Sequence, residues 1–272
     1  MQQDWIAYNV ACMTIDLRSS ADLSILTGVA TLILHSPPDG LMNQALIGRI
    51  DAALDRVEIA ITEGKVGAVV LRGAASAAFV RHHDVREIAM ADDGYAASGQ
   101  VHALYNRLAA LTVPSIAAID GACMGAGLEL ALACTLRYAG RDAGPFGFPE
   151  ITIGICPGGG GTQRAPRAIG ADAALELMLT GRLFDAAEAL RLGLVHGLSD
   201  DVTEHAAKVA ARLASRAPQA VAAIRRLSGM AEAGGLAEGC AAERDAFAAL
   251  LAGPDTRARI AALAAAGFPV VR

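Results

Sequence analysis

Apolar runs of strand length alternate with segments of helical spacing along most of the chain before residue 200. Val29–Leu34 and Val66–Leu71 are runs of mainly aliphatic residues, which are typical of strands in a sheet that is covered on both faces. From Asn43 to Thr62, apolar residues recur at intervals of three and four positions, which predicts an amphipathic helix. A helix over 99–111 and a strand over 115–119 continue the alternation, so we expect an α/β fold.

Shorter elements follow from glycine, proline and capping residues. The pattern predicts strands over 13–17 and 136–139, helices over 128–134, 171–180 and 185–192, and loops over 74–91 and 144–161. Asp185 is a suitable N-cap for the last of these helices, and Gly193 is a suitable stop.

The chain changes character near residue 200. From Val202 onward it is rich in alanine and reads as helical, with breaks at Pro218, Gly234-Gly235 and Gly253-Pro254. We therefore expect a core domain over 1–200 and a C-terminal helical region over 201–272.

Composition excludes several classes of protein. With 54% hydrophobic and 19% charged residues, the chain is suited to a large buried core and not to disorder. A net charge of −5 argues against nucleic-acid binding, and no apolar stretch is long enough for a membrane helix. The first residues lack the basic segment of a secretory signal, and the five scattered cysteines form no CxxC pair. We expect a cytoplasmic protein with reduced cysteines that act as small hydrophobic residues.

Common nucleotide, metal and hydrolase motifs are absent from the sequence. It contains no GxxxxGK[ST], HExxH or GxSxG, and Gln163 interrupts a GxGxxG pattern that begins at Gly158. His82 and His83 form the one local histidine group, which supplies too few ligands for a metal site. We expect no metal.

Two carboxylates in apolar surroundings are the main candidates for chemistry. Glu129 lies in an apolar helix start, and Glu150 lies between apolar residues of a loop region. Two such carboxylates can have separated pKa values, so that one acts as an acid and the other as a base. An alternative remains open for each: Glu129 as a first-turn acid that suits the helix dipole, and Glu150 as a solvated loop residue.

A glycine-rich run, Gly121–Gly127, opens the helix that carries Glu129. Free N–H groups at a helix N-terminus stabilise negative charge, and the enolate oxygen of a thioester would be a suitable guest. The alternative is that small residues only let the backbones pack closely.

Four blocks in this order resemble the crotonase, or enoyl-CoA hydratase/isomerase, superfamily. They are PSIAAIDGACMGAGLEL (114–130), FGFPEITIGICPGGGGTQR (146–164), LTGR (179–182) and AAEALRLGLV (186–195). The resemblance extends from about Val29 to about Phe268 and is densest from 114 to 195.

The resemblance implies a crotonase-like spiral of ββα turns with a C-terminal helical trimerisation region. It implies a homotrimer or a hexamer (a dimer of trimers) that acts on an acyl-CoA thioester, with coenzyme A as part of the substrate and no other cofactor. Backbone N–H groups of Ala126 and His83 would hold the thioester carbonyl. The implied substrate-binding residues are His83, Asp84, Arg86, Gly125 and Ala126.

The presence of both glutamates favours one branch of the superfamily. Hydratases that add water to a 2-enoyl-CoA, giving a 3-hydroxyacyl-CoA, resemble this chain in having both: Glu129 would orient or deprotonate the water and Glu150 would deliver a proton to the α-carbon. Isomerases often keep only the acid at the position of Glu150. The alternatives are therefore an isomerase, another crotonase-type acyl-CoA enzyme, or a non-catalytic acyl-CoA-binding relative.

The chain departs from the superfamily pattern at His82-His83-Asp84, where Gly-Ala-Asp or Gly-Gly-Asp is common. A histidine there has three open roles: to narrow the CoA passage, to touch the thioester, or to face solvent. Arg86 stands where the superfamily often has a lysine and is a candidate contact for a CoA phosphate. The sequence leaves the acyl group, the stereochemistry and the pathway open.

Overall fold

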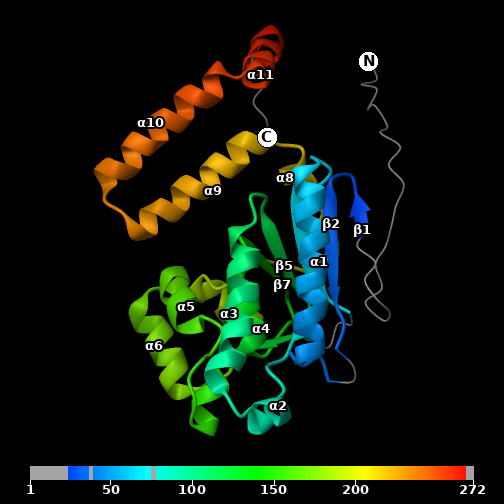
Figure 1. Cartoon of the computed structure of the whole chain (residues 1–272), viewed down its shortest axis with the longest axis vertical. Helices are drawn as coiled ribbons and strands as arrows, with labels where there is room; N and C mark the ends of the chain where they lie inside the picture. Colours follow the sequence, from blue (N-terminus) through cyan, green and yellow to red (C-terminus); the bar gives the residue numbers. More distant parts are fainter. Residues whose placement is uncertain (1–23, 37–38, 75–77, 268–272) are drawn as a thin grey trace. The chain divides into compact units, whose positions relative to one another are not determined.

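The computed structural model describes residues 24–36, 39–74 and 78–267 (Figure 1). The chain divides into two compact units, with the division between Ala214 and Ser215. The strand expected over 13–17 lies outside the described residues. Within the described ranges, no helix combines the length and hydropathy that crossing a membrane requires.

The first unit is built on a six-stranded sheet with the order β1-β2-β3-β5-β7-β9. Its strands are β1 (Ser24–Leu26), β2 (Val29–Leu34), β3 (Ala68–Gly73), β5 (Ser115–Ile119), β7 (Leu136–Gly140) and β9 (Gly197–Ser199). Strand β1 is antiparallel to β2, and the neighbouring pairs from β2 to β9 are parallel. Parallel strands need crossover connections, which the helices between them supply.

Alternate residues of the sheet belong to two hydrophobic cores, as the two-residue period of a strand requires. In β3, Val69 and Leu71 face the core that holds α1 (Gln44–Thr62) and α3 (Gly94–Ala110). Ala68 and Val70 face the other core, which α8 (Val202–Ala214) completes. The sheet is therefore covered on both faces, which explains its continuous apolar strands.

Helix α8 corrects the expected organisation of the chain. The sequence analysis assigned its residues to the C-terminal helical region, but Val202, Ala206, Val209 and Ala210 are buried against the sheet. Helix α8 accordingly belongs to the first compact unit, which ends at Ala214. The change in composition near residue 200 marks the start of an alanine-rich helix and not the start of the second unit.

The first unit also contains a second sheet of three parallel strands. It consists of β4 (Ala78–Val80), β6 (Ala122–Met124) and β8 (Phe146–Gly147), in the order β4-β6-β8. The expected loop over 74–91 was wrong in part, because it contains β4 and α2 (Val85–Met90). The expected loop over 144–161 likewise contains β8 and the 3₁₀ helix η1 (Pro149–Ile153).

Helices with clear local signals form where the sequence predicted them. Helix α6 (Ala171–Thr180) has the expected bounds, and α5 (Gly161–Ile169) precedes it. The side chain of Asp185 accepts a hydrogen bond from the N–H of Glu188, so it caps α7 (Ala186–Leu192), which ends at Gly193 as predicted.

The described part of the second unit, residues 215–267, contains three helices, separated at the predicted breaks. They are α9 (Pro218–Ala233), α10 (Leu236–Ala252) and α11 (Pro254–Ala265). No residue of α10 or α11 is buried. Among the described cysteines, Cys123 and Cys134 are buried as expected, whereas Cys156 and Cys240 are exposed.

Candidate active site

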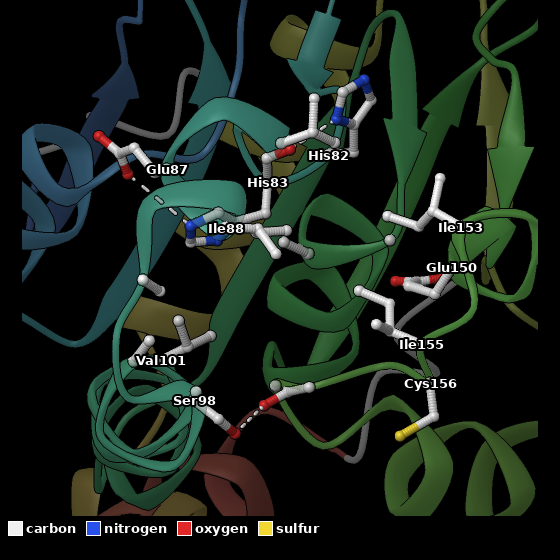
Figure 2. Close-up of a pocket in the computed structure, with 18 of the residues that line it drawn as sticks. His82, His83, Glu87, Ile88, Ser98, Val101, Glu150, Ile153, Ile155 and Cys156 are labelled. Carbon is white, nitrogen blue, oxygen red and sulfur yellow. Dashed lines mark hydrogen bonds and ion pairs between the residues drawn. The ribbon is translucent and has the colours of Figure 1, made fainter.

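One pocket of about 750 Å³ brings the predicted chemistry together (Figure 2). Its walls come from α2, α3, the N-terminus of α4 (Ala126–Ala133) and η1. Five residues predicted from the sequence line it: His83, Gly125, Ala126, Glu129 and Glu150. They come from separate segments of the chain, so the fold creates the site.

Glu129 is held from the main chain. All residues of α4 are buried, and the Glu129 Oε1 atom accepts hydrogen bonds from the N–H groups of Gly159 (2.8 Å) and Gly161 (2.7 Å). Burial raises the pKa of Glu129, and these two amides act against that rise because they favour the ionised carboxylate. A Cβ atom at Gly161 would lie 2.9 Å from Oε1, so this close approach requires glycine.

Glu150 has the opposite surroundings. It lies in the first turn of η1, and its buried Oε2 atom has no hydrogen-bond partner among the residues that the structure describes. Burial, followed by the nearby charge of Glu129, raises the pKa of Glu150 to about 7. Near neutral pH this carboxyl therefore exists in both protonation states, as a proton donor requires.

The Ala126 amide is the first N–H group of α4. The Gly125 carbonyl accepts from the Glu129 N–H at 2.9 Å, so the planar trans peptide directs the Ala126 N–H the opposite way, out of the helix N-terminus. Gly125 has a φ of 47°, and a Cβ atom there would lie 2.8 Å from the Glu150 Oε1 atom. The buried Tyr105 hydroxyl donates to the Ala126 carbonyl at 2.8 Å and anchors this turn.

The His83 amide is oriented by a bridge to Met42. The Met42 N–H donates to the His82 carbonyl (2.8 Å), and the Asp84 N–H donates to the Met42 carbonyl (2.7 Å). The His83 N–H must then point away from Met42, because the C=O and N–H of a trans peptide face opposite sides. His83 and Ala126 line the same pocket.

The His83 side chain is largely enclosed. Its Nε2 atom lies 3.8 Å from the Glu87 Oε2 atom, which also accepts from the Gln44 N–H at 2.9 Å. Burial lowers the pKa of His83, which favours the neutral imidazole. With 19% of the side chain exposed, this arrangement does not fit the solvent-facing alternative. The His82 Nδ1 atom lies 2.7 Å from the His83 carbonyl oxygen.

Asp84 and Arg86 are not among the described residues that line the pocket. Asp84 caps α2 by accepting from the Arg86 N–H, and the Arg86 guanidinium binds both of its carboxylate oxygens at 2.8 Å. The Arg86 guanidinium lowers the pKa of Asp84. Arg86 is exposed on its outer side, so a contact to a CoA phosphate stays a prediction.

Comparison with known proteins identifies the family of the chain. Residues 24–262 match the sequence profile of the family described as enoyl-CoA hydratase/isomerase. The chain belongs to the enoyl-CoA hydratase/isomerase family. It is 39% identical over 248 residues to a probable enoyl-CoA hydratase of Rhizobium meliloti (strain 1021), covering 88% of this chain and 92% of that protein.

Two further similarities place the chain within the enoyl-CoA hydratase/isomerase family. It is 35% identical over 237 residues to the 2,3-dehydroadipyl-CoA hydratase of Escherichia coli (strain K12), covering 86% of this chain and 91% of that protein. The crystal structure of an enoyl-CoA hydratase from Bacillus anthracis superimposes with a TM-score of 0.83 at 28% identity, covering 96% and 98% of the two chains. The fold is therefore the crotonase fold, and the chain is an enzyme of this family type.

The sequence analysis missed the partners that the fold supplies to Glu129. Arg164 donates to the Gly159 carbonyl (2.9 Å) and to the Asn106 Oδ1 atom (2.6 Å), and so holds the loop whose amides bind Glu129. The run of glycines at 158–161 was a visible signal, but the GxGxxG test treated it only as a possible phosphate loop. The apolar walls from α2, α3 and η1 had no sequence signal of their own.

Proposed function

We propose that the chain is an enoyl-CoA hydratase that adds water across the double bond of a 2-enoyl-CoA to give a 3-hydroxyacyl-CoA. The observation that carries the proposal is the pair of glutamates in one pocket. One is bound by two amides of a loop, and the other has a buried Oε2 atom without a partner among the described residues and a pKa raised to about 7. Such a pair suits a base and an acid that act in the same step.

In the proposed reaction, the amides of Ala126 and His83 donate to the thioester oxygen. These donors stabilise the negative charge that develops there as hydroxide adds to the β-carbon. Glu129 accepts the proton that water loses, and the π electrons move to form the enolate. Glu150 then delivers its proton to the α-carbon as the carbonyl re-forms. Proton exchange from Glu129 to Glu150 through solvent restores the starting state.

Loss of the conjugated enoyl absorbance tests the proposal directly. We expect the wild-type enzyme to consume 2-enoyl-CoA substrates, and Glu129→Gln and Glu150→Gln each to lower kcat by about 10²–10⁴ through loss of acid–base catalysis. Binding of a saturated acyl-CoA should persist in both variants, because Gln keeps the size of the side chain. Near-full turnover by both variants would contradict the acid–base assignment.

The same variants separate the hydratase from an isomerase, which is the alternative within the family. An isomerase that uses Glu150 alone would convert 3-enoyl-CoA to 2-enoyl-CoA and would retain that activity in Glu129→Gln. Conversion of 3-enoyl-CoA without consumption of 2-enoyl-CoA would replace the hydratase proposal. Binding of acyl-CoA without either reaction would favour a non-catalytic relative.

The proposal includes a homotrimer or a hexamer of two trimers. It is supported by the second unit, where α10 and α11 bury no residue within the single chain and where Leu236 and Phe247 are 85% and 65% exposed. Large apolar side chains of this kind are stabilised when a second chain covers them. Light scattering should give three or six times the chain mass. A cytoplasmic location, inferred from free cysteines, belongs to the same proposal.

A further inference from the structure

The proposed hydratase reaction does not specify the acyl group of the substrate. The side chains that line the pocket restrict which acyl groups can bind. In addition to the two glutamates, aliphatic side chains line the cavity (Figure 2). They include Ile88 of α2, Val101 of α3, Ile153 of η1, and Ile155 of the loop that follows η1. In Figure 2, Ser98 and Val101 lie on one side of the cavity, and Ile155 and Cys156 lie on the other.

These walls leave much apolar surface open within a concave site. Ile88, Ile153 and Ile155 are 36%, 57% and 40% exposed although all three line the pocket. Apolar surface in a cavity is stabilised when an apolar ligand displaces the water that covers it. A hydrocarbon group is therefore a suitable occupant.

Two polar side chains, Ser98 and Cys156, also line the cavity. The Ser98 hydroxyl donates to the Gly158 carbonyl at 2.7 Å, which uses its proton inside the protein. Cys156 is a thiol, which is a weak hydrogen-bond donor. Neither group is suited to hold an anion.

The charges that line the pocket are of one sign. Glu87, Glu129 and Glu150 are its acidic residues, and the described lining contains no arginine or lysine. His82 and His83 are the basic candidates, and His83 is enclosed beside Glu87. The Arg164 guanidinium donates to the Gly159 carbonyl and to Asn106, and Arg164 is not among the residues that line the pocket. A carboxylate at the end of an acyl chain would lose its water here without gaining a cation.

We propose that this pocket selects 2-enoyl-CoA substrates whose acyl group is an uncharged hydrocarbon and excludes those whose acyl group ends in a carboxylate. The inference rests on the proposed function, since it places the acyl group beside Glu129 and Glu150. It separates the chain from any enzyme of the same fold that provides a cation for an acyl carboxylate.

The test compares two six-carbon substrates that differ only at the distal end. These are 2-hexenoyl-CoA, which ends in a methyl group, and 2,3-dehydroadipyl-CoA, which ends in a carboxylate. We expect kcat/KM to favour 2-hexenoyl-CoA on the order of a hundredfold or more, because an unpaired buried carboxylate is costly. A preference below about threefold, or the reverse preference, would overturn the inference.

A charge introduced at one wall position sharpens the result. Ile155→Lys would place an ammonium group at the cavity, and Ile155→Gln is the matched control with a neutral polar side chain of similar length. We expect the lysine variant to narrow the preference about tenfold relative to the glutamine variant, since a cation would pair with the substrate carboxylate. An unchanged preference in both variants would show that the pocket charge does not set the selectivity.

Binding separates this inference from the proposed reaction. The Kd values of hexanoyl-CoA and adipoyl-CoA are measured for the wild type and for Glu150→Gln. Both ligands lack the 2-enoyl double bond, so neither protein can hydrate them. Tighter binding of hexanoyl-CoA supports the inference even if no 2-enoyl-CoA is hydrated, in which case only the proposed reaction fails. Equal or tighter binding of adipoyl-CoA contradicts the inference even if hydration is fast.

Discussion

Glu129 and Glu150 are the same side chain in two different surroundings. Glu129 lies on a fully buried helix, and two amides of the facing loop bind one of its oxygens. Glu150 lies on a short 3₁₀ helix next to the exposed Ile151 and Ile153, with a buried oxygen that has no partner. The pocket thus has one glutamate held by two amides of a facing loop and one glutamate that lacks such a loop partner.

The difference accounts for the two roles that we propose for one residue type. Burial raises the pKa of both carboxyls, but only for Glu129 do the amides of Gly161 and Gly159 oppose the rise. Hydrogen bonds to a carboxylate stabilise its ionised form, and for Glu150 only its own backbone N–H acts in this way, so that its pKa stays raised at about 7. Division of labour in this site therefore comes from the main chain around each glutamate and not from the glutamates themselves.

The largest effect should come from breaking the hydrogen-bonded side. In Gly161→Ala, the new Cβ atom would lie 2.9 Å from the Glu129 Oε1 atom and 2.9 Å from Phe148, so the loop or the carboxylate must move. We expect kcat to fall about 10²-fold, since a displacement near 1 Å in a catalytic group has effects of that size. Initial rates on a 2-enoyl-CoA measure it.

Gly158→Ala is the matched control, because a Cβ atom there would meet only the Ser98 hydroxyl, at 3.9 Å. Its rate should stay within about threefold of wild type, as expected for ordinary van der Waals contact. Equal losses of kcat in the two variants would show that the loop tolerates no added side chain at either position. The contact between Gly161 and Glu129 would then not explain the loss.

A smaller effect should appear when pH removes the proton from the other side. With the pKa of Glu150 raised to about 7, its protonated fraction falls about tenfold between pH 6 and pH 8. We expect kcat/KM to fall by about the same factor over this range, because the proposed step uses the protonated form. A pH profile that is flat from 6 to 8 would contradict the role of Glu150 as the acid.

The smallest effect concerns stability. The pKa of Glu150 is higher in the folded chain than its ordinary value of 4.5, so the fold binds this proton more tightly than the unfolded chain does. Stability is then full below about pH 4.5 and declines as pH rises through about 7. Glu150→Gln should remove this decline and raise the unfolding free energy at pH 8 by about 1–2 kcal/mol, after allowance for partial solvent screening.

Urea unfolding at pH 5 and pH 8 measures the difference between the two proteins. The gain at pH 5 should be about a quarter of the gain at pH 8, because pH 5 lies only just above the ordinary pKa of 4.5. Glu63→Gln, which removes an exposed carboxylate 2.8 Å from Lys65, is the control for the loss of one negative charge outside the pocket. A gain of equal size at both pH values would point to packing and not to charge.

Local signals made part of the fold predictable. Asp185 and Gly193 enclose their helix as expected, because capping depends on nearby backbone groups. Strands β4 and β6 were missed because each is three residues long and is fixed by pairing with the other. Helix α2 was missed although Asp84, its N-cap, was visible in the sequence.

The site was predictable in its residues but not in its environment. Apolar neighbours marked Glu129 and Glu150, and the family resemblance paired them. The helix of Glu129 begins at Ala126 and not at Leu128 as expected, which makes the Ala126 N–H its first amide. The amides that bind Glu129 come from the facing loop, and no periodicity within one segment of sequence can indicate such a contact.

The donors at this site also bear on how the enzyme can evolve. The N–H groups of Ala126 and His83 belong to the main chain, and every amino acid except proline has one. Most single-nucleotide changes at these codons would therefore alter the wall of the cavity and leave the donor in place. A lineage with this architecture can vary the ligands that it admits by ordinary genetic drift, while the machinery that handles the thioester is inherited intact.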